Sequence, residues 1–356
     1  MVIKLLKFHK KNYAVSTVIS VLLVIGLVVS SMAIIIFWAM PLLEEKAMKN
    51  EMQSIIYSFE MVDNNIENML IEGSGAKRIV GLICPNDKGS LSMSSYTDKF
   101  IVMYSYDTTY GFYTTELNDE DNYFNIITTG TGFNRADIYF LDPENELTPY
   151  ANSYGFVHPK SYIREVTVNP STNPINAGND LIGNLMINLF DTSFSSNEPK
   201  GRIWVFDLGS ITYQAYYGAG TQKTVYQNGA IFSTGFDDKG ILNEPALITT
   251  SNAVALRIIQ IKASSGFGGR GTPRLGLDLK NNIKREEPIA PSGDEQDSVY
   301  NLKFQIFGEN RQSWLDYFTK IDGFDHFIPD SNTVYYVTTN PISFILDCSF
   351  IEINIG

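Results

Sequence analysis

The sequence predicts a long N-terminal α-helix followed by a mainly antiparallel β ectodomain, arranged as two β-sandwich-like lobes. Residues 14–43 contain no charged side chain, and apolar residues then recur at spacings of three and four as far as Met69. From residue 75 onward, short runs of Val, Ile, Tyr, Phe and Thr alternate with Gly, Asn, Asp and Pro. The first two patterns are typical of helices, and the third is typical of antiparallel strands joined by turns.

The apolar stretch predicts a membrane-spanning helix with a defined orientation. About 20 apolar residues cross a bilayer, so the 30 residues of 14–43 are sufficient. The preceding residues carry Lys4, Lys7, Lys10 and Lys11 without any acid, and acids begin at Glu44. This asymmetry predicts a single N-terminal span in the cell membrane, with the basic leader in the cytoplasm and the C-terminal domain outside the cell.

The helix is predicted to cover residues 15–72, with a kink at Pro41 as one option. Beyond the apolar stretch, a heptad-like stripe predicts packing against protein rather than lipid. Gly73 and Gly75 follow the stripe and are typical of a helix end. The stripe consists of Met48, Met52, Ile55, Phe59, Val62, Ile66 and Met69.

Composition excludes several classes of function. The chain has 356 residues, with 27 Lys and Arg against 39 Asp and Glu, for a formal charge of −12. Phosphate-backbone binding needs a basic face, so we expect no nucleic-acid partner. Two cysteines and three histidines form no CxxC pair and no compact zinc-site spacing, so we expect no metal and no cofactor. With no GxSxG, P-loop or HExxH motif, we expect no catalytic residues and no enzyme.

The β region divides at two candidate linkers. The polar segment 191–201 predicts a boundary between a first lobe at 75–190 and a second at 202–356, and 285–298 predicts an exposed loop. A short helix is predicted near 311–322, with Trp314, Leu315, Phe318 and Ile321 on one face. Residues 180–190 fit either a second short helix or a strand.

Three local patterns predict turns and a strand irregularity. Asn228 and Gly229 predict a type I′ hairpin turn, and the segment 84–89 predicts the turn of an earlier hairpin. Near the C-terminus, alternating apolar residues change parity at Ile351, which predicts a β-bulge in that strand.

Two further patterns concern chemistry. Cys84 and Cys348 fall on predicted strands in an extracellular domain, which makes them a possible disulfide, while two buried thiols are the alternative. Gly266, Gly268 and Gly271 satisfy GxGxxG, but no helix start follows them. A hairpin loop therefore explains these glycines better than a nucleotide site.

The run KKNYAVSTVISVLLVIGLVV, from Lys10, resembles the class III signal peptide and first helix of archaeal type IV pilin-like proteins. Val15, Ser16, Val18 and Ile19 match the family's pattern, and Ala14 matches the small residue before the cut. The runs IWVFDLGSITY, VYQNGAIF and QSWLDYF in the ectodomain carry a weaker resemblance. The resemblance implies cleavage between Ala14 and Val15 by a membrane prepilin peptidase.

The resemblance implies a structural function without catalysis. The chain would be a subunit of an archaeal pilus-like surface filament, and the large ectodomain favours a minor or adhesive subunit. Its partners would be the membrane, the prepilin peptidase, and itself or other pilin-like subunits. The residues that would enter the membrane or filament core are Val15, Ser16, Val18, Ile19, Leu22, Leu23 and Ile25.

Other interpretations of the same residues stay open. Ser31 and Ala33 have the form of an ordinary signal-peptide cleavage site, and the apolar stretch also fits a plain membrane anchor. In the second case the chain is a tethered extracellular binding or adhesion protein that does not polymerise. Its binding surface would be an aromatic platform formed by clustered tyrosines, which are equally typical of a strand core: Tyr104, Tyr106, Tyr110, Tyr113, Tyr213, Tyr216 and Tyr217.

Overall fold

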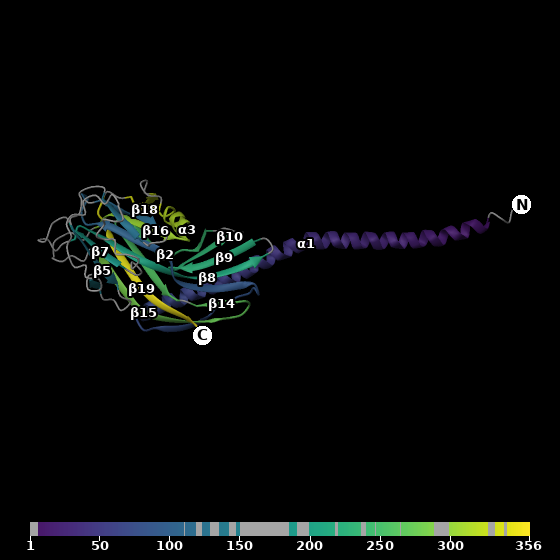
Figure 1. Cartoon of the computed structure of the whole chain (residues 1–356), viewed down its shortest axis with the longest axis horizontal. Coiled ribbons are helices and arrows are strands. Elements are labelled where there is room, and N and C mark those ends of the chain that lie inside the picture. The colour runs from purple at the N-terminus through teal and green to yellow at the C-terminus, as the bar shows by residue number, and fades with distance from the viewer. Residues whose placement is uncertain are drawn as a thin grey trace. The chain divides into compact units, whose positions relative to one another are not determined.

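The computed structural model describes residues 6–109, 111–118, 123–128, 135–141, 147–149, 185–190, 199–217, 220–235, 240–245, 247–263, 265–287, 299–326, 332–337 and 340–356. These fall into two compact units, Met1–Gln53 and Ser54–Gly356. The first is helical, and the second combines the end of the same helix with β-sheets (Figure 1). The predicted architecture, a long helix followed by mostly antiparallel β-structure, is confirmed.

The helix α1 runs continuously over Leu6–Glu72, including Pro41. It begins before the predicted residue 15 because the leader contains no Gly or Pro that would interrupt it. Its predicted end is confirmed. Gly73 has a φ of +94° and Gly75 a φ of +89°, values that side chains disfavour. The amide of Gly73 closes the last turn by donating to the Met69 carbonyl at 2.9 Å.

A five-stranded sheet follows an order that differs from the chain order. Its strands, from one edge to the other, are β1 (Lys77–Gly81), β15 (Arg274–Glu287), β19 (Ser343–Ile355), β13 (Ala253–Lys262) and β12 (Leu247–Thr250). All neighbours are antiparallel except β13 and β19, which are parallel. The last strand of the chain, β19, therefore lies at the centre of this sheet.

The larger sheet contains twelve of the described strands. Its main path is β11 (Gly240–Asn243), β10 (Ala230–Gly235), β9 (Gly220–Gln227), β8 (Gly201–Tyr217), β2 (Gly89–Ser105), β16 (Tyr300–Gly308), β18 (Thr333–Tyr336) and β17 (Phe324–His326). Attached to this path are β14 (Gly266–Gly268), which pairs with β2, and β7 (Leu185–Phe190), which pairs with β8. β5 (Arg135–Leu141) pairs with β7 and with β6 (Leu147–Pro149), and β3 (Phe112–Asn118) with β4 (Tyr123–Thr128) forms a separate pair.

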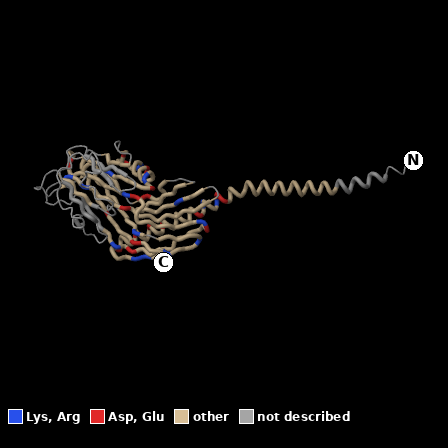
Figure 2. The backbone as a smooth tube through the Cα atoms, in the orientation of Figure 1, with Lys and Arg blue, Asp and Glu red and all other residues tan. Residues whose placement is uncertain are grey.

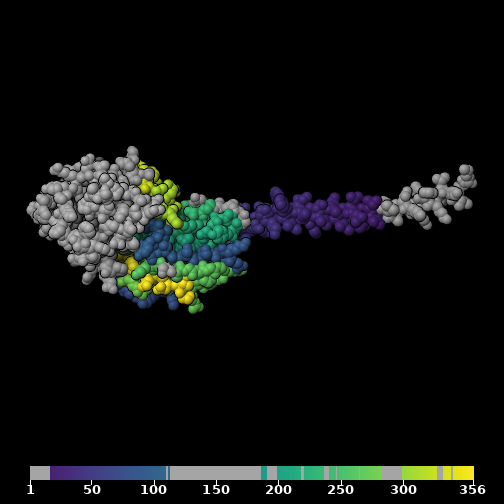
Figure 3. Space-filling view, viewed as in Figure 1, coloured from purple at the N-terminus to yellow at the C-terminus, as the bar shows by residue number. Residues whose placement is uncertain are grey.

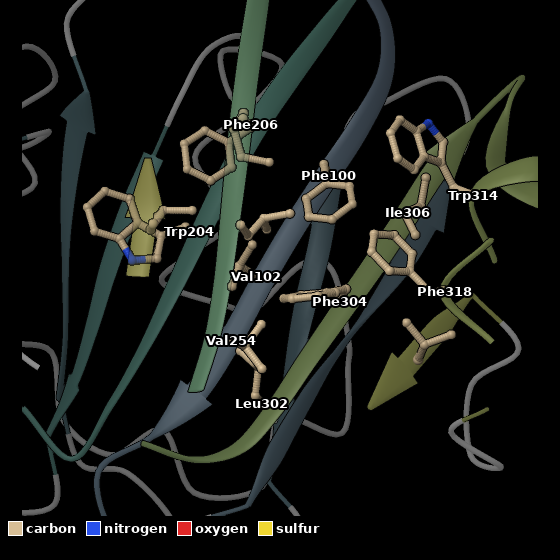
Figure 4. Packing of buried hydrophobic residues seen from close by; sticks show 14 of the residues in the cluster. Phe100, Val102, Trp204, Phe206, Val254, Leu302, Phe304, Ile306, Trp314 and Phe318 are labelled. Carbon is tan, nitrogen blue, oxygen red and sulfur yellow. The ribbon is translucent and has the colours of Figure 1, made fainter. Parts of the chain in front are cut away.

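The two sheets share two hydrophobic cores. The first core joins both sheets to the short helix α3 (Arg311–Phe318), and aromatic rings dominate it (Figure 4). Its centre includes Phe100, Trp204, Phe206, Phe304, Trp314, Phe318 and Phe344. The second core joins both sheets to α1, and aliphatic side chains dominate it. Its members include Ile55, Phe59, Val62, Ile66, Met69, Ile211, Ile259, Leu277 and Ile351.

Strand parity decides which core a residue enters. Along β19, Phe344 and Leu346 are buried in the first core, whereas Ile351 and Ile353 have the opposite parity and are buried in the second. Alternate residues of a strand point to opposite faces, so β19 buries one face along its first part and the other face along its second part. The predicted change of parity is confirmed, but the bulge lies in the partner strand β15, where Lys280 is the extra residue opposite β19.

The change of face coincides with a close crossing of the two sheets. Gly209 of β8 lies so near β13 that a Cβ atom would stand 2.0 Å from the Ile261 carbonyl oxygen. On the adjoining strand β2, Ser95 Oγ donates to the Ala263 carbonyl at 2.9 Å and accepts from the Ala263 amide at 2.9 Å. Only a glycine permits this approach.

Two local predictions about the β region are wrong, and a third had left open two options. Strands β2 and β7 precede residue 191 yet pair with β8, so 191–201 does not separate two lobes. The segment 84–89 is not a hairpin turn, because β1 and β2 belong to different sheets. Of the helix and the strand that residues 180–190 could form, the structure shows a strand at 185–190, with both parities of β7 buried between neighbours β5 and β8.

Two other predictions are confirmed. The turn between β9 and β10 has positive φ angles at Asn228 (51°) and Gly229 (76°), as a type I′ turn requires. The short helix α3 buries Trp314, Leu315 and Phe318, although it ends at Phe318 and not near residue 322. The predicted loop 285–298 lies mostly outside the described residues, and β15 extends to Glu287.

Candidate functional site in the N-terminal helix

The apolar part of α1 exposes its side chains along the first unit (Figure 3). Of the residues predicted to enter a membrane or filament core, Val18, Ile19, Leu22, Leu23 and Ile25 are between 52% and 69% exposed. The backbone of Ala14, Val15 and Ser16 is helical, and their side chains lie outside the described set. An 18-residue window reaches a mean hydropathy of 2.9 with none of it buried, so this helix could cross a membrane by length and composition.

Water is an unfavourable environment for such a surface. Burial of apolar area contributes roughly 25 cal/mol per Å², and soluble monomers rarely expose contiguous apolar patches above a few hundred Å². Figure 2 shows no charged residue in the described part of this stretch until the acids at Glu44 and Glu45. The segment from Val18 to Leu43 is therefore poorly suited to exposure to water.

The polar groups within this stretch include hydroxyls that are satisfied inside the helix. Ser30 Oγ donates to the Gly26 carbonyl at 2.7 Å, and Ser31 Oγ donates to the Val28 carbonyl at 2.9 Å. A hydroxyl that already has a hydrogen bond costs less free energy to transfer out of water. These two serines are thus compatible with an apolar environment.

The carboxyl half of α1, defined here as residues 54–72, is part of the β unit. The predicted stripe continues through this unit as Ile55, Phe59, Val62, Ile66 and Met69, each at most 2% exposed. All five side chains belong to the second core, and the Phe59 ring lies 6.3 Å from the ring of Tyr226. The helix end cannot be withdrawn without opening this core.

A buried polar contact links α1 to the β9–β10 hairpin and its neighbour β11. Asp63 accepts hydrogen bonds from Tyr226 Oη at 2.9 Å and from Asn243 Nδ2 at 3.2 Å. Burial raises the pKa of Asp63 to about 6, because loss of hydration outweighs the two hydrogen bonds and the nearby guanidinium of Arg257, while Glu67 raises it further. The same burial and the neighbouring carboxylate raise the pKa of Tyr226 above its ordinary value.

A second polar contact lies one helical turn further on. Arg257 of β13 donates from Nη1 to Glu67 Oε1 at 2.5 Å and from Nε to Asp347 Oδ2 at 3.3 Å. Its side chain is 26% exposed. These hydrogen bonds and the two carboxylates raise the pKa of Arg257 despite its partial burial, so the guanidinium stays charged. Arg257 therefore ties α1 to the two central strands of the five-stranded sheet.

Backbone groups complete the attachment of the helix. Ser58 Oγ accepts a hydrogen bond from the Ile83 amide at 3.2 Å, just beyond the edge strand β1. Asn282 Nδ2 donates to the Leu70 carbonyl at 3.2 Å, which satisfies a group near the helix end. These two contacts, each between a side chain and a backbone group, attach α1 near both ends of its buried stripe.

The polar contacts of α1 could be found only partly from the sequence. Asp63 and Glu67 stand four residues apart on the helix, and Arg257 interrupts the apolar strand AVALRIIQIK. A charged residue in a strand that is otherwise apolar requires a partner. Nothing in the sequence, however, indicates that its partner is Glu67, which lies 190 residues away.

The other predicted sites are not assembled. Of the two options for Cys84 and Cys348, the structure shows two buried thiols and no disulfide. Both side chains are buried, but Cys84 belongs to the second core and Cys348 to the first. Burial in apolar surroundings raises the pKa of Cys84 to about 11, as expected for an unreactive thiol.

The glycine pattern and the tyrosine clusters form no ligand site in the described residues. Gly266 and Gly268 belong to strand β14, and the chain continues into strand β15 without a helix. Tyr104 and Tyr213 are buried in different cores, and Tyr216 is 55% exposed, so these tyrosines share no platform. Tyr110 and the side chain of Tyr113 lie outside the described residues.

Comparison with known proteins finds no matching family model, no matching curated protein and no matching solved structure.

Proposed function

We propose that the chain is a structural subunit, minor or adhesive, of an archaeal type IV pilus-like surface filament. The observation that carries this proposal is the division of α1 into two environments. From Val18 to Leu43 its side chains are apolar and exposed, whereas from Ile55 to Met69 its stripe is buried in the β unit. The first part suits lipid before assembly and neighbouring helices afterwards, because apolar burial stabilises both states.

The buried part of the helix supports a role in transmitting force between the filament core and the β domain. A filament subunit must transmit force between its packed helix and its outer domain. Here the same α-helix forms one wall of a core, and its contacts with Tyr226 and Arg257 add polar attachment. The β domain then forms the outer surface, held by a continuous element instead of a loop.

Assembly into such a filament would begin with cleavage of the leader. Removal of residues 1–14 by a membrane prepilin peptidase would leave Val15 as the new N-terminus of the apolar helix. The proposed cleavage is supported by the resemblance of the residues around Ala14 to class III signal peptides. Processing and assembly are proposed together, since an uncut leader carries four lysines into an apolar filament core.

Mass spectrometry of the N-terminal peptide from protein in native membranes tests the proposal. A mature chain that begins at Val15, together with filaments that an antibody to the β domain labels in electron micrographs, is the expected result. Replacement of Ala14 by a bulky residue (Ala14→Leu) should block both. An intact N-terminus and an absence of labelled filaments would instead indicate a tethered binding or adhesion protein that does not polymerise.

A further inference from the structure

We propose that Asp63 makes the docking of the carboxyl half of α1 sensitive to pH, so that the helix is held more tightly when this carboxyl is protonated than when it is ionised. The proposal concerns only the unit Ser54–Gly356 and stands whether or not the chain forms filaments. It rests first on the position of Asp63 between α1 and the β9–β10 hairpin. The side chain is half-buried and faces Tyr226, which is fully buried.

The charges around Asp63 are unbalanced. The charged groups that act on it in the described residues are Glu67 on the same helix and Arg257 on β13. Arg257 is also shared with Asp347 on β19. Glu67 and Asp347 both contact the guanidinium, and Asp63 interacts electrostatically with Glu67 and Arg257. Uptake of a proton by Asp63 therefore relieves part of the repulsion between carboxylates at this partly buried interface. Tyr226 and Asn243, the remaining polar neighbours, donate hydrogen bonds without carrying charge.

The direction of the effect follows from linkage. The pKa of Asp63 is raised from 3.8 to about 6 by the docked structure, with burial as the largest cause. Between these values the docked helix retains the proton and the undocked helix has lost it, so docking weakens as pH rises. The two values correspond to an increase of about tenfold in the undocking equilibrium constant between pH 5 and pH 7.5.

Amide hydrogen exchange of the full chain in detergent micelles tests this directly. After correction for the intrinsic exchange rate, protection of amides over residues 58–70 should fall about tenfold between pH 5 and pH 7.5. Amides of β8 and β16 should keep their protection. An equal loss in those strands, or no loss in the helix, would overturn the proposal.

Substitutions assign the effect to Asp63. Asp63→Asn has nearly the same shape and no charge, so its helix protection should not vary with pH, whereas the control Glu60→Gln should keep the tenfold change. Persistence of the pH dependence in Asp63→Asn would refute the assignment. Should that variant fail to fold, Tyr226→Phe provides a second test. Because the lost hydroxyl donor lowers the pKa of Asp63 in the wild type, the midpoint should move to higher pH, and an unmoved midpoint would contradict the proposal.

Discussion

Single atoms decide how closely the two sheets approach at residue 209. A Cβ on Gly209 would stand 2.0 Å from the Ile261 carbonyl oxygen and 2.7 Å from the Ser94 carbonyl oxygen. Both obstacles are backbone atoms, which cannot move aside as a flexible side chain does. The crossing therefore depends on the absence of one methyl group.

We predict that Gly209→Ala lowers the free energy of unfolding by about 2 kcal/mol, as overpacking of an interior typically does. Gly268→Ala is the matched control, because no atom lies within 4 Å of its added Cβ. Denaturant unfolding of both variants beside the wild type measures the difference. Equal stabilities of the two variants would show that the sheets do not approach closely at Gly209.

Lys303 is a second residue whose surroundings predict a measurable effect. Its side chain donates to the Phe112 carbonyl at 2.5 Å, and only 5% of the residue is exposed. Burial lowers the pKa of Lys303 from 10.5 to about 8. In the pH range between these values, the unfolded chain binds a proton that the folded chain does not, so stability from this residue rises with pH.

We predict that Lys303→Met removes this contribution. The difference in stability between wild type and variant should shift in favour of the wild type by about 80-fold in the folding equilibrium constant from pH 8 to pH 10.5. Denaturant unfolding at several pH values measures it. A difference that does not vary over this range would mean that Lys303 is hydrated in the folded protein.

At the scale of secondary structure, the carboxyl half of α1 is stabilised mainly by packing of one of its faces in the second core. Phe59 is fully buried in the second core, while Tyr57, two residues earlier, is 60% exposed. The two aromatic residues lie on the same turn, with the same helix around them. They separate the contribution of packing from that of helix propensity.

We expect Phe59→Ala to cost about 3–5 kcal/mol, the usual range for removal of a buried aromatic side chain. Tyr57→Ala should change stability by about 0.5 kcal/mol or less, as surface substitutions do. Thermal or denaturant unfolding in detergent compares them. Similar losses for both variants would be inconsistent with burial of this face of α1 in the β unit.

The elements could be predicted wherever the signal was local. The apolar stripe of α1, the turn at Asn228 and Gly229, and the buried face of α3 each depend on residues close together in the chain. The spacing of Leu185, Met186 and Leu189 did not distinguish a helix from a strand, because a strand buried on both faces shows no alternation of apolar and polar residues. Pattern alone does not separate such a strand from a buried helix.

Long-range pairing was outside the reach of the sequence. The lobe boundary at 191–201 failed because β2 pairs with β8 across that segment, and the hairpin at 84–89 failed because the chain there changes sheets. The contacts that dock α1 could not be predicted from the sequence for the same reason. Asp63 looks like a solvated helix residue, and the partner of Arg257 cannot be identified, until α1 is placed against β9 and β13.

At the scale of the whole molecule, both cores depend on β19. This strand pairs with β13 on one side and β15 on the other, and it contributes Phe344 to the first core and Ile351 to the second. No other described strand of the five-stranded sheet could bridge β13 and β15 in its place, since β12 and β1 are the edges. Loss of β19 splits the sheet in two.

We predict that a chain ending at Ile342 fails to fold. Circular dichroism should show loss of β-structure, and the protein should be cleaved rapidly by protease at strands β13 and β15. A chain lacking only Gly356, which belongs to neither core, is the control and should remain resistant. Resistance of the shorter chain would show that the five-stranded sheet closes without its central strand.

The central place of β19 also means that the five-stranded sheet can close only after residues 343–355 have been translated. Translation proceeds at roughly 5–20 residues per second, so the 300 residues that separate Leu43 from Ser343 take on the order of 15–60 seconds to make. Throughout that interval the apolar helix is already made, and once β13 and β15 follow they have exposed edges and no strand between them until β19 is complete. A ribosome that stalls in the last fifth of the message would therefore leave β13 and β15 with exposed edges that can pair with another chain.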